Sequence, residues 1–469
     1  MVFSSLSFIF VFLPAVLLAH ALAPRRWRNW VLLVASCLFY AWGEPRYLAI
    51  MLGTIAIDYL GALAVDRARA PAVRKVLTAA VVAANLAALG YFKYFNFVAG
   101  NLNALFGADL DFIKVVLPIG ISFYTFQALS YVIDVARGEV AVQRNPFKLA
   151  LYVTLFPQLI AGPIVRYRDV CAQIEERCVL PENVVGGLSR FIVGLAKKVL
   201  IANTMGAVAD KIFALPVDSL GCGTAWLGAV AYSFQLFYDF SGYSDMAIGL
   251  GRMLGFTFKE NFDHPYVSRS VTEFWRRWHI SLSSWFREYL YIPLGGNRVS
   301  RPRNIVNLAI VFLATGVWHG AAWTFVVWGC WHGAFVILER ITDWHRRGDG
   351  PAGRMVHHLY ALAVIVFGWV LFRAESFAQA GAFTRAMCGF GPTAPVPTSV
   401  GALLCEPLTL AALLAAIVCA TSGGLGVLEA ARSRGIRGWL ANAYLFLLFY
   451  LSVVQIVAST YNPFIYFRF

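Results

Sequence analysis

Long apolar runs, separated by short polar or charged stretches, fill the chain almost from end to end. A helix needs about 20 apolar residues to cross roughly 30 Å of bilayer hydrocarbon, so each run is a candidate membrane span. Several runs are short, which favours broken or re-entrant helices for part of the set. The pattern predicts an all-α polytopic membrane protein with about ten to twelve transmembrane helices. The candidate runs lie at 6–23, 29–43, 47–65, 76–92, 115–134, 148–165, 185–206, 223–238, 242–256, 304–319, 321–338, 356–374, 407–428 and 439–460.

The segment 257–303 is the longest interruption of this pattern. Within it, residues 270–290 place apolar side chains at helical spacing and arginines on the other faces, which predicts one amphipathic helix at the membrane surface. We expect this segment on the cytoplasmic side. No repeat and no soluble domain is visible, so the sequence predicts a single membrane domain over 1–469 with a re-entrant or amphipathic portion.

Composition excludes a soluble protein of this length. Apolar residues make up 59% of the 469 residues and charged residues only 14%, against about 25% charged residues in an average soluble domain. The eight cysteines are scattered and contain no C-x-x-C pair, so we expect neither a disulfide framework nor a metal site.

The net charge of +14 is carried by short clusters between the apolar runs. This distribution is typical of cytoplasmic loops and not of a nucleic-acid-binding surface, so we expect no nucleic-acid partner. The loops 24–28 and 66–75 are rich in positive charge, which places them in the cytoplasm and the N-terminus outside. Because the positive residues follow the first run, that run is expected to be a retained helix and not a cleaved signal.

Two histidines stand out as candidate chemistry. His319 ends an apolar run between Gly316 and Gly320, which would let the backbone bend and a substrate approach closely. An apolar setting would keep its imidazole neutral, and a neutral imidazole can act as a general base. An interhelical hydrogen bond is an equally good explanation. His279 shares the apolar face of the amphipathic helix, where spacing alone favours a histidine bound at the interface.

Other polar groups in the apolar runs have structural explanations. His332 lies in a second W-H-G, and a continuous helix would put it on another face from His319 unless the helix breaks near Gly320. Ser241-Gly242 between Asp239 and Asp245 predicts a broken helix, where the carboxylates line a polar pocket or cap half-helices. The chain has no P-loop, dinucleotide fingerprint, H-E-x-x-H or G-x-S-x-G, so ATP-driven transport and serine hydrolysis have no support.

The chain resembles the membrane-bound O-acyltransferase family, and within it the alginate O-acetyltransferase-like bacterial branch. The resemblance runs almost from end to end through long, ordered motifs. Its densest motifs are FYDFSGYSDMAIGLGRMLGF, NFDHPY, TEFWRRWHISLSSWFREYLYIPLGGNR and GVWHGAAWTFVVWGCWHG, and others are LFYAWGEPRYL, LGYFKYFNF, LPIGISFYTFQALSYVIDV and LFPQLIAGPIVRY.

The resemblance implies helices around a thin membrane centre, entered by a funnel from each face. The family's near-invariant histidine falls on His319, and its second signature histidine falls on His279, so both are expected to be catalytic. The expected donor is acetyl-CoA, a thioester that needs no ATP and no metal. Further expected site residues are Arg276, Arg277 and Arg287 for the donor phosphates, and Asp239, Trp318 and Ser283 for the substrate pocket.

The implied function is O-acetylation of a secreted polysaccharide by a bacterial inner-membrane enzyme, with alginate as the favoured polymer. A periplasmic partner acetyltransferase and the surrounding lipid would be its other contacts. The alternative acceptors are cellulose or another exopolysaccharide, peptidoglycan and teichoic acid. An acyltransferase that modifies lipids is a further alternative function. A transporter is the alternative from another class, and it would show intramembrane charge pairs and inverted repeats, of which the sequence shows neither.

Overall fold

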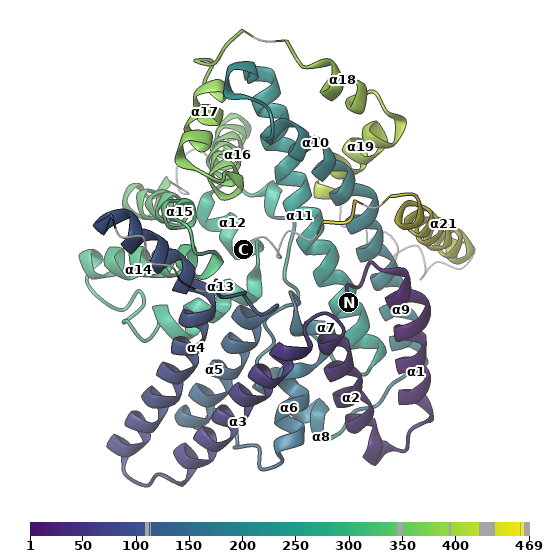
Figure 1. The fold of residues 1–469 in the computed structure, drawn as a ribbon, viewed down its shortest axis with the longest axis vertical. Helices are drawn as coiled ribbons and strands as arrows, with labels where there is room; N and C mark the ends of the chain where they lie inside the picture. The colour runs from purple at the N-terminus through teal and green to yellow at the C-terminus, as the bar shows by residue number, and fades with distance from the viewer. Residues whose placement is uncertain are drawn as a thin grey trace. The chain divides into compact units, whose positions relative to one another are not determined.

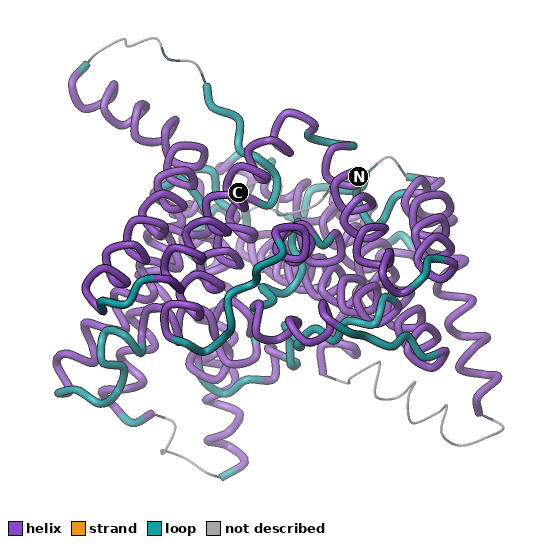
Figure 2. Tube along the Cα trace, turned by 90° about the horizontal axis from the view of Figure 1, so that it is seen from below, coloured by secondary structure: helices purple, strands orange, loops and turns teal. Residues whose placement is uncertain are grey.

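A computed structural model describes the chain except for residues 108–111, 113, 345–349, 394, 422–436, 460 and 464–469. The described residues form helices and connecting loops, and none of them is in a strand (Figure 2). The prediction of an all-α fold is therefore confirmed. The chain divides into two compact units: unit 1 comprises Met1–Phe191 and Met246–Lys259, and unit 2 comprises Ile192–Asp245 and Glu260–Phe469.

Unit 1 contains the N-terminal helices, several of which begin at proline. Pro45, Pro71 and Pro146 stand in the first turn of their helices, where a missing amide hydrogen costs nothing. Helices α3, α4 and α5 run side by side (Figure 1). The elements of unit 1 are η1 (Phe8–Phe12), α1 (Leu13–Leu22), η2 (Arg25–Trp27), α2 (Arg28–Ala41), α3 (Pro45–Arg67), α4 (Pro71–Phe106), α5 (Ile121–Arg137), α6 (Pro146–Thr154), α7 (Phe156–Leu159) and α8 (Tyr167–Glu175).

Unit 2 contains the histidines singled out in the sequence. Helices α9 (Pro181–Ala196) and α11 (Cys222–Met253) contribute residues to both units. The remaining elements of unit 2 are η3 (Lys197–Ala202), α10 (Asn203–Phe213), η4 (Val217–Ser219), η5 (Pro265–Val267), α12 (Val271–Arg277), α13 (Ile280–Phe286), η6 (Arg287–Tyr291), α14 (Arg301–His319), α15 (Trp323–Thr342), α16 (Pro351–Arg373), α17 (Phe377–Met387), α18 (Thr398–Leu404), α19 (Pro407–Thr421) and α21 (Arg437–Ala458).

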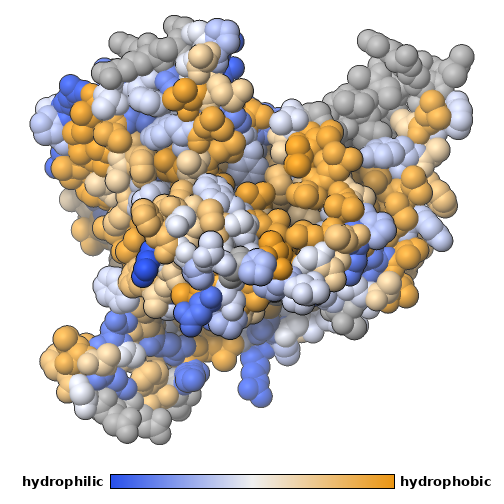
Figure 3. All heavy atoms as spheres, turned by 90° about the horizontal axis from the view of Figure 1, so that it is seen from above, coloured by the Kyte–Doolittle hydropathy of each residue, from blue (hydrophilic) through white to orange (hydrophobic). Residues whose placement is uncertain are grey.

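Four described helices are long and apolar enough to cross a membrane: α3, α4, α16 and α21. The pair α18 and α19, bent by 69°, would add a fifth span. Extensive hydrophobic areas on the visible surface agree with an integral membrane protein (Figure 3). Parts of two predicted runs, 422–428 and residue 460, lie outside the described residues.

The helix break predicted at Ser241-Gly242 is wrong, because α11 runs continuously from Cys222 to Met253. Gly242 serves close packing instead of a bend. A Cβ atom at this position would lie 2.7 Å from the Gly194 carbonyl oxygen and 3.1 Å from the Lys198 backbone nitrogen. Small residues of this kind let two helix backbones approach each other.

Residues 461–463 follow α21 and bind to the polar face of η3 and α10. The Tyr461 hydroxyl donates to Asp210 Oδ2 over 2.6 Å. Asn203 Nδ2 donates to the Tyr461 carbonyl and to Asn462 Oδ1, at 3.4 and 3.3 Å. Lys198 Nζ donates to the Pro463 carbonyl oxygen. The segment 461–463 is thus built into unit 2 by side chains more than 250 residues earlier in the chain.

Candidate active site

His319 is the last residue of α14, where the chain changes direction. Gly320 is extended, and α15 begins at Trp323. The His319 ring packs against Trp328 and Phe372, with ring centroids 4.9 and 5.3 Å apart. Its side chain is buried, with 7% of the residue surface exposed. The break that the sequence allowed near Gly320 is therefore present, and it leaves His319 at a helix end among aromatic rings.

The glycines beside His319 pack against protein, so the predicted role of leaving open space for a substrate is wrong. A Cβ atom at Gly316 would lie 2.5 Å from the Phe325 carbonyl oxygen and 3.1 Å from the Gly329 Cα. A Cβ atom at Gly320 would lie 2.3 Å from the Phe325 ring. Gly316 thus allows α14 and α15 to pack backbone to backbone, and Gly320 leaves room for the Phe325 ring.

His279 interrupts the segment that the sequence predicted as one amphipathic helix over 270–290. The helix α12 ends at Arg277, His279 adopts a left-handed backbone with φ 44°, and α13 begins at Ile280. A left-handed backbone is uncommon for residues other than glycine, although histidine is among those that tolerate it. The prediction of a continuous helix is wrong, while the amphipathic character remains: Phe274, Trp275 and Leu282 are buried, and Arg276 is exposed.

Asn261 explains why the chain bends at His279. Its backbone carbonyl accepts from the Ile280 amide at 2.9 Å, and its side-chain Oδ1 accepts from the Ser281 amide at 3.1 Å. The first two backbone donors of α13 therefore bond to one residue of a neighbouring loop, as a helix cap would. The amide Nδ2 of Asn261 donates to Ser244 Oγ on α11 at 3.1 Å. Oδ1 also lies 3.2 Å from His279 Nδ1.

Glu339 on α15 holds the other end of this segment. Its buried carboxylate accepts from the Val271 amide at 2.6 Å, and from the Thr272 amide and hydroxyl at 2.9 and 2.6 Å. The side chain of Ser270 caps the same helix by accepting from the Glu273 amide at 2.9 Å. A carboxylate at a helix N-terminus is favoured by both the free amides and the helix dipole. Glu339 thereby ties α12 to the helix that follows His319.

His279 is 1% exposed, and this burial lowers the pKa of its imidazole from 6.5 to about 3. Desolvation penalises the charged form of a buried base. The imidazole is therefore neutral over the physiological pH range, which is the state that can accept a proton.

Trp318 lies against both histidines. Its ring centroid is 6.2 Å from that of His279 and 5.0 Å from that of His319. Phe240 on α11 completes this face of His279, with centroids 4.6 Å apart. The two imidazoles, which the sequence places 40 residues apart, thus border one indole ring. Trp318 thus connects the two histidines that the sequence singled out.

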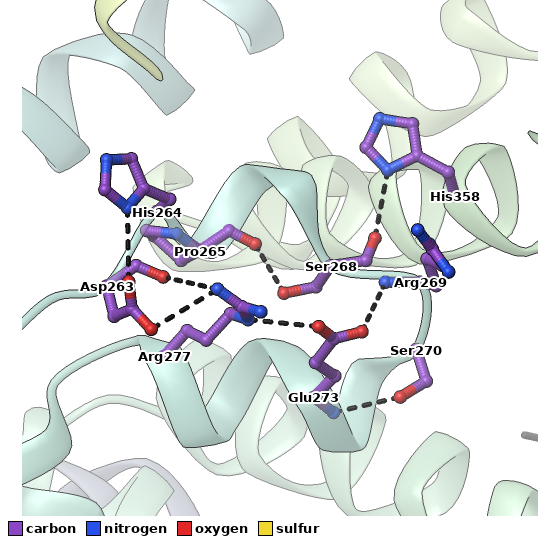
Figure 4. Close-up of polar contacts among 9 residues, drawn as sticks. All are labelled: Asp263, His264, Pro265, Ser268, Arg269, Ser270, Glu273, Arg277 and His358. Atoms are coloured by element: carbon purple, nitrogen blue, oxygen red, sulfur yellow. Dashed lines mark hydrogen bonds and ion pairs between the residues drawn. The ribbon is translucent and has the colours of Figure 1, made fainter. Parts of the chain in front are cut away.

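The three arginines expected at the donor phosphates differ in their surroundings. Arg277 is engaged within its own segment: it contacts Glu273 at 3.0 Å and Asp263 at 3.3 Å, as Figure 4 shows. Arg276 and Arg287 are exposed, and neither forms an ion pair with another described residue. These two side chains can reach an external anion, whereas Arg277 would have to leave its carboxylates.

Asp239 is held in a buried ion pair. Its Oδ1 lies 2.6 Å from Lys198 Nζ, and both side chains are 4% exposed. Six residues further along α11, Asp245 Oδ2 lies 2.7 Å from Lys197 Nζ. The expectation that the apolar runs contain no charge pairs is therefore wrong. The partners were hidden because Lys197 and Lys198 lie inside the apolar run 185–206.

Ser283 and His332 are placed away from strong polar partners. Ser283 Oγ makes a long contact of 3.4 Å to the Trp278 carbonyl. His332 is fully buried, and neither ring nitrogen has a hydrogen-bond partner among the described residues. Its ring contacts Trp275 and Trp328, with centroids 5.1 Å apart in each case. Trp328 therefore contacts both His332 and His319. The two imidazoles lie closer together than a continuous helix would have placed them.

No group of three or more histidine, cysteine, aspartate or glutamate side chains suited to a metal ion occurs in the part of the chain that the structure describes. The residue most clearly missed from the sequence is Asn261. It lies in the motif NFDHPY, where a polar residue between apolar runs is a visible signal. The sequence does not show that its bonding partner is His279, 18 residues later.

Comparisons with known proteins agree on one family. The sequence model of the membrane-bound O-acyltransferase family matches residues 139–377. The probable alginate O-acetylase AlgI of Azotobacter vinelandii is 41% identical and that of Pseudomonas putida 42% identical, each over the full length of both chains. The peptidoglycan O-acetyltransferase of Helicobacter pylori is 35% identical over 83% of this chain and 80% of its own length.

Proposed function

The chain belongs to the membrane-bound O-acyltransferase family, and from this premise we propose that it acetylates a secreted polysaccharide, with alginate as the polymer. Family membership makes it an acyltransferase and an integral membrane protein. Two relatives that match over their full length carry the name alginate O-acetylase, which supports alginate as the acceptor.

The contact of His279 and His319 with one indole ring is the observation that carries this proposal. His319 takes the proton of an acceptor hydroxyl as the oxygen attacks the thioester carbonyl. The C–S bond then breaks, the new ester is released, and the proton passes from His319 to the thiolate. His279 contributes a second neutral imidazole at the same indole, where it hydrogen-bonds to the reacting groups.

The proposed donor is acetyl-CoA, bound from the cytoplasmic side. Arg276 and Arg287 are exposed on the segment that carries His279, so their guanidinium groups are available for phosphate oxygens. Arg277 would take part only by exchanging its bonds to Glu273 and Asp263. Asp239, Trp318 and Ser283 remain proposed pocket residues, with the Asp239 charge already neutralised by Lys198.

We also propose the location and topology: a single domain over 1–469 in the bacterial inner membrane, with ten to twelve spans and the N-terminus outside. Loops 24–28, 66–75 and 257–303 then face the cytoplasm, as their positive charge favours. The test is labelling of Trp27→Cys and Ala70→Cys variants in a background without native cysteines. Labelling of both positions in intact cells by an impermeant reagent would overturn this topology.

Acetylation of a secreted polymer places the acceptor outside, and we propose a periplasmic acetyltransferase as the partner that completes transfer. The relative named peptidoglycan O-acetyltransferase keeps a cell-wall acceptor as the principal alternative, with cellulose and teichoic acid behind it. Membranes containing the protein, supplied with labelled donor and separate alginate, cellulose, peptidoglycan and teichoic acid, would identify the polymer by which fraction becomes acetylated.

The two lysine–aspartate pairs are a feature that a solute transporter would share. Because each pair is neutral as a unit and the family is one of acyltransferases, we interpret them as paired charges that stabilise the helix interfaces.

The deciding experiment compares His319→Ala with wild type. We expect a folded, membrane-inserted variant whose acetyl transfer falls by about 10²–10⁴-fold, the usual contribution of a general base. Acetyl content per unit of detergent-extracted, monodisperse protein separates lost chemistry from lost folding. Near-normal specific activity would show that His319 is a packing residue.

A further inference from the structure

Asn261 uses its backbone carbonyl and both polar atoms of its side chain in hydrogen bonds, although it lies in a loop. It is 1% exposed, and its side chain contacts α11, α13 and the bend at His279. Oδ1 contacts the Ser281 hydroxyl at 2.8 Å, the Ser281 amide at 3.1 Å and His279 Nδ1 at 3.2 Å, while Nδ2 contacts Ser244 Oγ at 3.1 Å. These side-chain bonds all go to residues outside the loop, so they do not serve the loop's own conformation.

The orientation of the Asn261 amide follows from its neighbours. The backbone amide of Ser281 can only donate, so the atom that faces it at 3.1 Å must be the oxygen Oδ1. The nitrogen Nδ2 then faces Ser244 Oγ, which can accept. This assignment uses a backbone donor, whose direction is not ambiguous, and does not depend on the choice between oxygen and nitrogen for the amide itself.

The same geometry determines the tautomer of His279. An amide oxygen has no hydrogen to donate, so the contact between Oδ1 and Nδ1 is a bond only if Nδ1 carries the proton. Ser281 Oγ lies 3.4 Å from Nδ1 but 2.8 Å from Oδ1, so its hydroxyl donates to Asn261. Since the buried ring is neutral, the lone pair is then on Nε2.

We propose that Asn261 is a positioning residue, which holds His279 as the Nδ1–H tautomer with Nε2 as its proton acceptor. The same side chain keeps the left-handed backbone at His279 by capping α13. In enzymes that use histidine as a base, the partner of one ring nitrogen decides which nitrogen can accept a proton. The catalytic meaning of this tautomer rests on the proposed function, whereas the tautomer itself does not.

Register along the loop supports this role. The Asp263 amide donates to the Arg277 carbonyl at 2.9 Å, and the Asn261 carbonyl accepts from the Ile280 amide at 2.9 Å. The loop at 261–263 therefore runs beside the bend at 277–280, and the Asp263–Arg277 ion pair visible in Figure 4 closes the same contact from the outside. The loop therefore contacts the chain on both sides of His279, at Arg277 and at Ile280, and this holds Asn261 against His279.

The test is nitrogen NMR of histidine-labelled protein in detergent or nanodiscs, with the His279 signals assigned from a His279→Gln variant. Wild type is expected to show a protonated, pyrrole-type Nδ1 and a pyridine-type Nε2. Asn261→Asp keeps an oxygen acceptor and should keep this signature, whereas Asn261→Ala should shift the ring toward the Nε2–H tautomer. Asn304→Ala is the matched control, because Asn304 is also a buried asparagine, and it bonds to Tyr291 and Gly296 and not to a histidine.

Activity is measured on the same samples. We expect Asn261→Ala to lose about 10²-fold in acetyl transfer per folded protein, the scale of a misplaced catalytic group. Asn304→Ala should lower the yield but not the specific activity. A pyridine-type Nδ1 in wild type, or an Asn261→Ala protein with the wild-type tautomer, would overturn the proposal. A confirmed tautomer combined with full activity of His279→Gln would instead overturn the catalytic role of His279 and leave the tautomer assignment intact.

Discussion

The α14–α15 hairpin packs His319 and His332 among aromatic rings and close-packed glycines, whereas the bent segment 261–291 holds His279 through hydrogen bonds. The first kind of support depends on the shapes of apolar side chains. The second depends on polar groups, a helix cap and partly exposed ion pairs, so part of it weakens as the salt concentration rises. The proposed site therefore combines an imidazole that is fixed by packing with one that is fixed by bonding.

The difference separates the two proposed catalytic histidines from His332. His319 ends a helix and keeps a small exposure, and His279 has a directed bond at one ring nitrogen. His332 has the same W-H-G context as His319 but lies within a helix, with no exposure at all. A local motif does not distinguish these cases, because the backbone around it determines whether a proton can reach the ring.

The largest expected effect separates the three histidines by function. His319→Gln and His279→Gln should each lose about 10²–10⁴-fold in acetyl transfer per folded protein, because each removes a proton acceptor. His332→Gln should retain specific activity close to wild type, since the His332 ring has no hydrogen-bond partner among the described residues that would orient a ring nitrogen for proton transfer. Single-turnover transfer from labelled donor measures this directly. Equal losses in all three variants would remove the distinction between His319 and His332.

The second prediction tests the close packing of α14 against α15. Gly316→Ala should destabilise the protein by about 1–3 kcal/mol, because its new methyl group meets the Phe325 carbonyl and Gly329. Gly90→Ala on α4 is the matched control, since nothing lies within 4 Å of its added Cβ. The thermal midpoint in detergent is the measurement, and an unchanged midpoint for Gly316→Ala would show that α14 and α15 can separate without cost.

The third prediction concerns pH and applies to the bonded side. The folded state holds His279 with a pKa near 3, against 6.5 in the unfolded chain, so the unfolded state binds the proton first. Stability from His279 is therefore complete above pH 6.5 and is lost as the pH falls from 6.5 toward 3. Thermal midpoints measured from pH 7.5 to 4.5 should fall less steeply in His279→Gln. Parallel curves would contradict the assignment.

The smallest expected effect is that of Arg277→Gln. Its ion pairs with Glu273 and Asp263 are partly exposed, so their loss should cost less than about 1 kcal/mol and less still in high salt. Thermal midpoints at low and high ionic strength test this. If the variant instead raised the KM for the donor at unchanged stability, Arg277 would belong with Arg276 and Arg287 in phosphate binding.

Residues whose role depends on periodicity or on a long motif could be predicted from the sequence. The all-α membrane fold follows from the apolar runs, and the family motifs pointed to His279 and His319. Their common contact with Trp318 could not be predicted, because it depends on how α12 and α14 pack. Spacing alone placed His279 within a continuous helix, since no local signal reveals that Asn261 takes over the amides of Ile280 and Ser281.

Two predictions failed for reasons of context. A serine–glycine pair predicts a helix break in solution, but Gly242 contacts the Gly194 backbone, and a continuous helix packs best there. Lys197 and Lys198 lie inside a run that is mostly apolar, so the run as a whole hides their charges. Each pairs with a carboxylate on α11. Composition in a window cannot show which face a charged side chain takes.

The binding of residues 461–463 to η3 and α10 has a consequence for biogenesis. Translation makes Lys198, Asn203 and Asp210 more than 250 residues before Tyr461 and Pro463, their hydrogen-bond partners. At about 5–20 residues per second, Asn203 and Asp210 therefore lack these bonds for on the order of ten seconds or more, although Lys198 can already pair with Asp239. Docking of residues 461–463 is thus a late step in the assembly of unit 2.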